Sequence, residues 1–306
     1  MTQKTPNIYE GNHPTVNVAL CQVQTVPWQI EANLQRLLES LRVAAEHDAH
    51  LAVTPECVLH GSAHPKDPDY MNRILSSAQP IDSPIMERLR QAAVQHQMAL
   101  VVGLALHEAD GRISNGTVTI DPEGTLLGAY RKVHCPRFES VNGDGVFSPG
   151  SEFHVHPIEL NGVAFGLGVM IGLDRQIPEA ARCLRALGAD LIACPLATDT
   201  VDTARRRPYA DGELVTRCRA AENEVFVAVV NHAGRFNGGS FLAGPSGECL
   251  HQMGTVPGVH LLHLPLEPVR TRFHAEPFGW MGWGYRRPEV YRKYLGRLAT
   301  GEAPCE

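Results

Sequence analysis

The sequence contains no hydrophobic run long enough to cross a membrane and no cluster of basic residues. Its purely apolar stretches are far shorter than the ~18–20 residues that a membrane helix requires. With 27 Lys and Arg against 33 Asp and Glu, the formal net charge is -6, and nucleic-acid binding needs clustered positive charge. Residues 1–14 are polar and lack the apolar core of a signal peptide. We therefore predict a cytoplasmic protein that begins with a flexible leader and has neither membrane nor nucleic acid as a partner.

The cysteines and histidines show no metal-binding pattern. The eight cysteines include no Cys-x-x-Cys pair, and the fifteen histidines form no His-Glu-x-x-His motif. In a reducing compartment, most of these cysteines serve as small apolar residues. We assign neither a metal ion nor a cofactor.

Apolar runs typical of strands alternate with segments of helical periodicity along the chain. Residues 16–23 alternate as a strand does, and residues 30–47 carry apolar side chains at helical spacing. Asp121-Pro122-Glu123-Gly124 and Gly244-Pro245-Ser246-Gly247 are turn signatures between strands, so each predicts a hairpin. Further strands are expected at 51–54, 99–106, 163–171, 189–194, 225–230 and 259–264, and further helices at 84–96, 178–187 and 211–223.

This alternation predicts an α/β architecture whose sheets are mixed because of the hairpins. No linker or low-complexity stretch interrupts residues 15–270, so we predict one domain over that range. The tail, residues 271–306, is rich in arginine, aromatic residues and proline.

Three separated motifs each follow an apolar run of strand type. They are Thr54-Pro55-Glu56-Cys57, the Tyr-Arg-Lys-Val-His-Cys-Pro segment that contains Lys132, and the segment from Gly172 to Glu179. Together they resemble the glutamate, lysine and cysteine motifs of the nitrilase superfamily of carbon–nitrogen hydrolases. The Arg-Ala-Ala-Glu-Asn run at residues 219–223 resembles a helix of the same family. The resemblance covers residues 16–270.

The resemblance implies a four-layer α-β-β-α sandwich in which two sheets pack face to face. It also implies that Glu56 is a general base and that Lys132 stabilises the oxyanion of a tetrahedral intermediate. The implied substrate is a small amide, carbamoyl or nitrile compound. Members of the family commonly dimerise, so we expect a homodimer or larger homo-oligomer with the tail, residues 271–306, at a subunit interface.

Gly172 stands where the family pattern has its nucleophilic cysteine. Glycine has no side chain that can attack a carbonyl, and loss of a nucleophile from a catalytic set can cost on the order of a millionfold in rate. The resemblance thus implies an amidase-like scaffold that is inactive or altered in thiol hydrolysis. Whether Gly172 is natural or engineered stays open.

Two other functions remain open at this stage. The chain is a non-catalytic homologue that binds a small molecule or a partner protein, or it is an enzyme of another type. In the second case Glu56 acts on water or on a C–H bond, and Lys132 stabilises the product anion of a lyase, isomerase or cyclase.

Six further residues are candidates for substrate binding. Family members often carry a second glutamate in the loop after the lysine, and here either Glu139 or Asp144 takes that place. Leu173 and Asp174 follow the nucleophile position, and Cys194 ends the next strand, near the same rim. Arg205 begins a run of three arginines after a loop that borders the pocket in this architecture. It is a candidate to hold an anionic substrate group.

Overall fold

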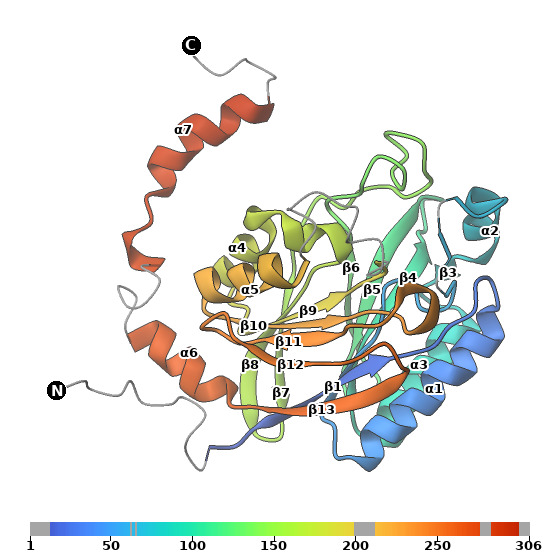
Figure 1. Ribbon diagram of the computed structural model, residues 1–306, viewed down its shortest axis with the longest axis horizontal. Helices are drawn as coiled ribbons and strands as arrows, with labels where there is room; N and C mark the ends of the chain where they lie inside the picture. Colours follow the sequence, from blue (N-terminus) through green and yellow to red (C-terminus); the bar gives the residue numbers. More distant parts are fainter. Residues whose placement is uncertain (1–12, 62, 65, 199–211, 276–282, 300–306) are drawn as a thin grey trace.

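Two β-sheets form the centre of the protein (Figure 1). The computed structural model describes residues 13–61, 63–64, 66–198, 212–275 and 283–299. The first sheet has the strand order β13-β1-β2-β4-β5-β6, with β3 paired to β4, and the second has the order β12-β11-β10-β9-β8-β7. Parallel and antiparallel neighbours occur in both sheets, as the hairpins predict.

The strands are β1 (Val16–Gln22), β2 (Leu51–Val53), β3 (Gln79–Pro80), β4 (Ala99–His107), β5 (Ile113–Ile120), β6 (Leu126–Arg131), β7 (Val155–Leu160), β8 (Val163–Val169), β9 (Leu191–Pro195), β10 (Phe226–Val230), β11 (Phe241–Ala243), β12 (Cys249–Gln252) and β13 (Gly258–Leu264). The α-helices are α1 (Ile30–Glu46), α2 (Tyr70–Ser77), α3 (Pro84–His96), α4 (Pro178–Ala186), α5 (Gly212–Asn223), α6 (Leu266–Ala275) and α7 (Pro288–Ala299). None of the helices in the described ranges is long and apolar enough to span a membrane.

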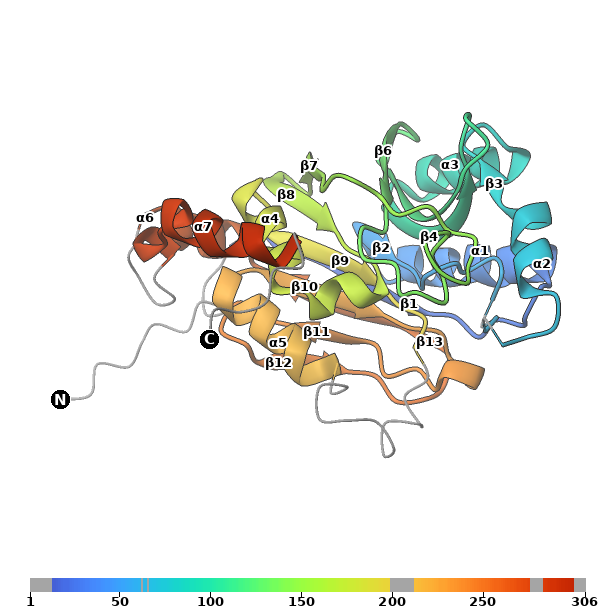
Figure 2. The ribbon, with the colours of Figure 1, turned by 90° about the horizontal axis from the view of Figure 1, so that it is seen from above.

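The alternation of side chains along β1 shows how the layers are built. Val16, Val18 and Leu20 belong to the apolar core between the two sheets. Ala19 and Cys21 belong to the core that packs beneath α1 and α3. A third core joins β9 and β10 to α4 and α5, on the outer face of the second sheet. Figure 2 shows α1 and α5 on opposite sides of the sandwich, which confirms the predicted α-β-β-α layering.

The predicted elements are found within one or two residues of their expected ends, but β3, β7, α2, α6 and α7 were not predicted. The edge strand β7 contains Pro157, which cannot donate a ladder hydrogen bond and weakens the strand pattern. Helix α2 has eight residues and one buried side chain, Ile74, so its helical periodicity is weak. The predicted domain end at residue 270 falls inside α6, which packs against β8.

Helix α7 extends away from both sheets (Figure 1). Tyr294 and Leu295 on this helix are 56% and 48% exposed. The leader, as far as residue 12, and the tail aromatic residues Phe278 and Trp280 lie outside the described residues.

Candidate active site

The carboxylate of Glu56 is held by three donors from different elements. Glu56 follows β2 after Thr54 and Pro55, and it is 4% exposed. Its Oε1 accepts hydrogen bonds from Nδ2 of Asn115 at 2.6 Å and from Nζ of Lys132 at 2.7 Å. Its Oε2 accepts one from the main-chain N–H of Ala197 at 2.9 Å. Strands from both sheets therefore fix the orientation of this carboxylate.

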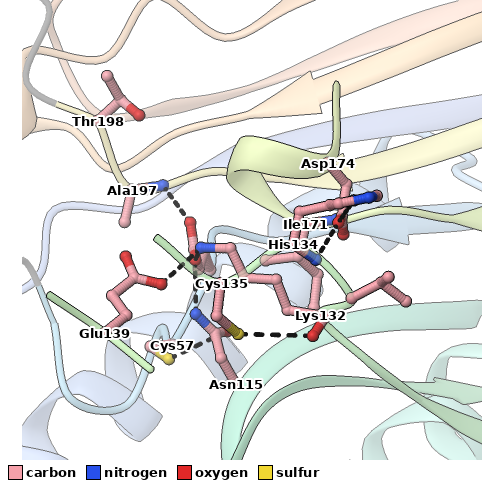
Figure 3. A network of polar contacts seen from close by, with 12 residues as sticks. Cys57, Asn115, Lys132, His134, Cys135, Glu139, Ile171, Asp174, Ala197 and Thr198 are labelled. Carbon is pink, nitrogen blue, oxygen red and sulfur yellow. Dashed lines mark hydrogen bonds and ion pairs between the residues drawn. The ribbon is translucent and has the colours of Figure 1, made fainter. Parts of the chain in front are cut away.

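Lys132 directly follows β6 and is 2% exposed. Its Nζ donates to Glu56 and also to Oε2 of Glu139, at 2.7 Å in each case (Figure 3). Burial acts to lower the pKa of the Lys132 ammonium, but the two carboxylates outweigh burial and hold that pKa well above its usual value. Burial raises the pKa of the Glu139 carboxyl, Lys132 opposes that change, and the charge of Glu56 reinforces it.

Gly172 begins the short 3-10 helix that follows β8, and its φ of +50° lies in the left-handed region. A Cβ built on Gly172 would stand 2.8 Å from Oε2 of Glu56 and 3.1 Å from Nζ of Lys132. A side chain at this position would therefore meet the carboxylate and the ammonium first.

Asp174 fixes the turn that contains Gly172 relative to the segment that contains Lys132. It is fully buried, and its carboxylate accepts hydrogen bonds from the Tyr130 hydroxyl at 2.7 Å and from the main-chain N–H of Ile171 at 2.9 Å. Its other oxygen accepts from the main-chain N–H and from Nδ1 of His134, both at 2.8 Å. Asp174 is thus surrounded by protein donors and does not reach the cavity.

A cavity of about 260 Å³ opens over Glu56, Lys132 and Gly172. A buried carboxylate and ammonium at the floor of a small cavity can exchange protons with a bound molecule and can stabilise negative charge that develops on its oxygen. Among the described residues, no group of three or more His, Cys, Asp or Glu is arranged to hold a metal ion.

Comparison with known proteins agrees with this geometry. The family model for carbon–nitrogen hydrolases matches residues 17–271. The chain belongs to the carbon–nitrogen hydrolase family. An (R)-stereoselective amidase from Pseudomonas sp. is 31% identical over 247 residues, which cover 78% of this chain and 81% of the amidase. The N-carbamoylputrescine amidase of Solanum tuberosum is 28% identical over 69% of this chain and 73% of its own length.

Solved structures of related carbon–nitrogen hydrolases show the same fold. An amidase from Nesterenkonia sp. AN1 superposes with a TM-score of 0.71 at 25% identity, over 95% of this chain and 100% of that one. That structure carries the acetamide moiety of fluoroacetamide on its active-site cysteine. Another structure of an amidase from this source is described as a member of the nitrilase superfamily. The predicted family and α/β sandwich are therefore confirmed.

The structure distinguishes between Glu139 and Asp144, the two acidic residues that the sequence left as alternatives. Glu139 lies against Lys132 in the cavity, whereas the Asp144 side chain is 77% exposed and pairs with Arg137 at 3.6 Å. Leu173 lines the cavity.

Another predicted binding residue, Cys194, is placed away from the cavity. Cys194 is fully buried in the core beneath α4 and α5. It is not among the residues that line the cavity. Arg205 lies outside the described residues.

Sequence reasoning missed two residues that orient Glu56. Asn115 on β5 is 2% exposed, and a polar side chain inside a buried strand is a signal that was available. His232 is fully buried after β10 and donates from Nε2 to the main-chain oxygen of Glu56 at 2.7 Å. Its Nδ1 accepts from the Thr25 hydroxyl at 2.8 Å. No sequence pattern pointed to that histidine.

Proposed function

We propose that this cavity receives a small amide or carbamoyl compound, with Glu56 as general base and Lys132 as the group that stabilises the oxyanion. In this proposal Gly172 takes the place of the family's cysteine. The chain is then inactive or altered in hydrolysis that proceeds through a thiol. One observation supports the proposal most directly, namely that a Cβ built on Gly172 would contact both Glu56 and Lys132.

We expect none of the described cysteines near the cavity to replace the nucleophile. Cys57 lines the cavity, and its Sγ lies 3.6 Å from Oδ1 of Asn115. Burial raises the pKa of the Cys57 thiol well above its usual value, and the charges of Glu56 and Glu139 raise it further. Burial likewise raises the pKa of Cys135 to about 12. A thiol in this state supplies very little thiolate at neutral pH.

The test compares ammonia release by the unchanged chain with release by Gly172→Cys, over small amides, carbamoyl compounds and nitriles. We expect turnover only in the cysteine form. Gly172→Ala serves as the control, because it adds the same Cβ without a thiol. Failure of Gly172→Cys on every compound, together with no binding of any of them to the unchanged chain, would contradict the proposal.

Two alternatives predict different results in the same assay. A non-catalytic binding protein holds a small molecule or partner and converts nothing, in either form of residue 172. A non-hydrolytic lyase, isomerase or cyclase is active with glycine at 172 and loses that activity on Glu56→Gln. Location in the cytoplasm and assembly into a homo-oligomer remain predictions.

A further inference from the structure

The cavity has a charged floor and a wall of both apolar and polar side chains, the polar ones being His60, His64, Arg175, Gln176 and Thr198. Glu56, Lys132 and Glu139 provide the charges of the floor, and Asn115 completes it. Much of the remaining wall is formed by apolar or aromatic side chains, namely Tyr70, Ile74, Phe138, Leu173 and Phe236. Phe138 is 52% exposed, which places it at the mouth of the cavity.

Neither cation among the described lining residues is available to a substrate carboxylate. Lys132 donates two of its three N–H groups to carboxylates, and the third is the one that the proposed function assigns to the oxyanion. Arg175 is 5% exposed, and its Nη1 donates to the main-chain oxygen of Gly212 at 2.7 Å and to the Thr216 hydroxyl at 3.2 Å. The Arg175 guanidinium is thus hydrogen-bonded to the first turn of α5. An anionic group in this cavity would also face Glu56 and Glu139, whose charges repel it.

We infer that the cavity selects a compact, uncharged amide or carbamoyl compound that carries an apolar group, and that it rejects amides bearing a carboxylate. This inference rests on the proposed function and adds the substrate class. The volume of about 260 Å³ is smaller than the ~300–1,000 Å³ of sites for drug-sized ligands. Each methylene buried against the apolar wall contributes roughly fourfold in affinity.

The experiment uses the Gly172→Cys form and three amides of similar length. Butyramide is neutral and apolar, succinamate ends in a carboxylate, and 4-aminobutyramide ends in an ammonium group. We expect kcat/KM for ammonia release from butyramide to exceed that for succinamate by at least about tenfold. Equal or better turnover of succinamate overturns the inference and favours Arg205 as the holder of an anionic substrate group.

Two matched substitutions at the rim test the apolar wall directly. Phe138→Arg places a cation at the mouth, whereas Val141→Arg places one on the same loop at a residue that is 51% exposed and is not among those lining the cavity. We expect Phe138→Arg to raise the succinamate-to-butyramide ratio of kcat/KM several-fold and Val141→Arg to leave it unchanged. An unchanged ratio in Phe138→Arg, or equal changes in both variants, contradicts the assignment of Phe138 to the substrate wall.

Binding to the unchanged chain separates failure of this inference from failure of the proposed function. Titration calorimetry with the three amides needs no turnover. Preference for butyramide supports the inference even if Gly172→Cys is slow. Preference for succinamate overturns the inference and leaves the proposed function intact, because a small amide still binds. Absence of binding and turnover for all three amides contradicts both.

Discussion

Nδ2 of Asn115 lies 2.6 Å from Oε1 of Glu56, the same oxygen that accepts a hydrogen bond from Lys132. Asn115 lies on β5, between β4 and β6 of the first sheet, and every residue of this strand is buried. The Asn115 amide therefore holds the Glu56 carboxylate in one orientation before any ligand arrives. This preorganisation matters because a proton-transferring group must meet its substrate at hydrogen-bond distance.

Replacement of Asn115 by aspartate should disable the site with little change in side-chain volume. The new carboxylate would repel Glu56 and remove a buried donor, which typically costs about 1–3 kcal/mol. In the Gly172→Cys form, we expect kcat/KM for a neutral amide to fall roughly 10- to 100-fold. Asn142→Asp, at an exposed residue, controls for the added charge. Undiminished turnover in Asn115→Asp would show that the hydrogen bond has no role in catalysis.

Substitution of Gly172 should cost stability for two reasons that can be separated. An L-residue in left-handed backbone pays about 1–2 kcal/mol, and a Cβ on Gly172 must also displace the Glu56 carboxylate. Gly162→Ala reports the first cost alone, because Gly162 has a φ of +72° and no atom within 4 Å of its Cβ position. We expect Gly172→Ala to lower the free energy of unfolding in urea by roughly 1–3 kcal/mol more than Gly162→Ala. Equal losses would mean that the carboxylate moves aside freely.

The free energy of unfolding should fall as the pH drops below 6.5. Burial lowers the pKa of both His60 and His232 from 6.5 to about 4. Below pH 6.5 the unfolded chain takes up protons on these rings while the folded chain does not, so protonation favours unfolding until about pH 4. Each ring contributes up to roughly 3 kcal/mol to this loss.

Urea unfolding at pH 7 and pH 5 measures this loss. His232→Gln should reduce the difference between the two free energies, whereas His47→Gln, at an exposed histidine, should not. A difference that is the same in both variants would exclude His232 as a source of the acid sensitivity.

Helix α7 provides the test of the predicted homo-oligomer. Tyr291, Tyr294 and Leu295 are 37%, 56% and 48% exposed on a helix that stands away from the sheets. If these side chains pack against a second copy, then Tyr294→Glu combined with Leu295→Glu should convert a dimer into a monomer. Arg292→Glu, also exposed, is the control on the same helix. Sedimentation of the unchanged chain as a monomer at every concentration would show the prediction to be wrong.

Periodicity predicted the strands and helices, because each depends on local alternation, whereas the four layers were implied by the resemblance to the nitrilase superfamily. In β9, Ala193 faces the other sheet and Cys194 faces the helices. Alternation separates the two residues, but both faces of this strand are buried. The sequence therefore did not reveal that Cys194 points away from the cavity.

The loop after Lys132 shows a second limit of prediction from the sequence. Glu139 and Asp144 are both acidic and lie in one irregular segment, so no periodicity distinguishes them. The choice depends on how the loop folds. The main-chain N–H of Glu139 donates to the main-chain oxygen of Pro136, and that of Asp144 donates to the main-chain oxygen of Arg137, whose exposed side chain also pairs with Asp144. Such contacts are set by the whole loop, and residue type alone does not encode them.

The site draws its parts from both sheets, since Glu56 and Lys132 follow strands of the first sheet and Gly172 and Ala197 follow strands of the second. A bound molecule that contacts residues from both sheets therefore links the two sheets to each other. Because unfolding releases the bound molecule, its binding raises the protein's resistance to heat and proteolysis by mass action. The molecule need not be converted for this effect. The free energy of unfolding then depends on the concentration of the bound molecule as well as on the sequence.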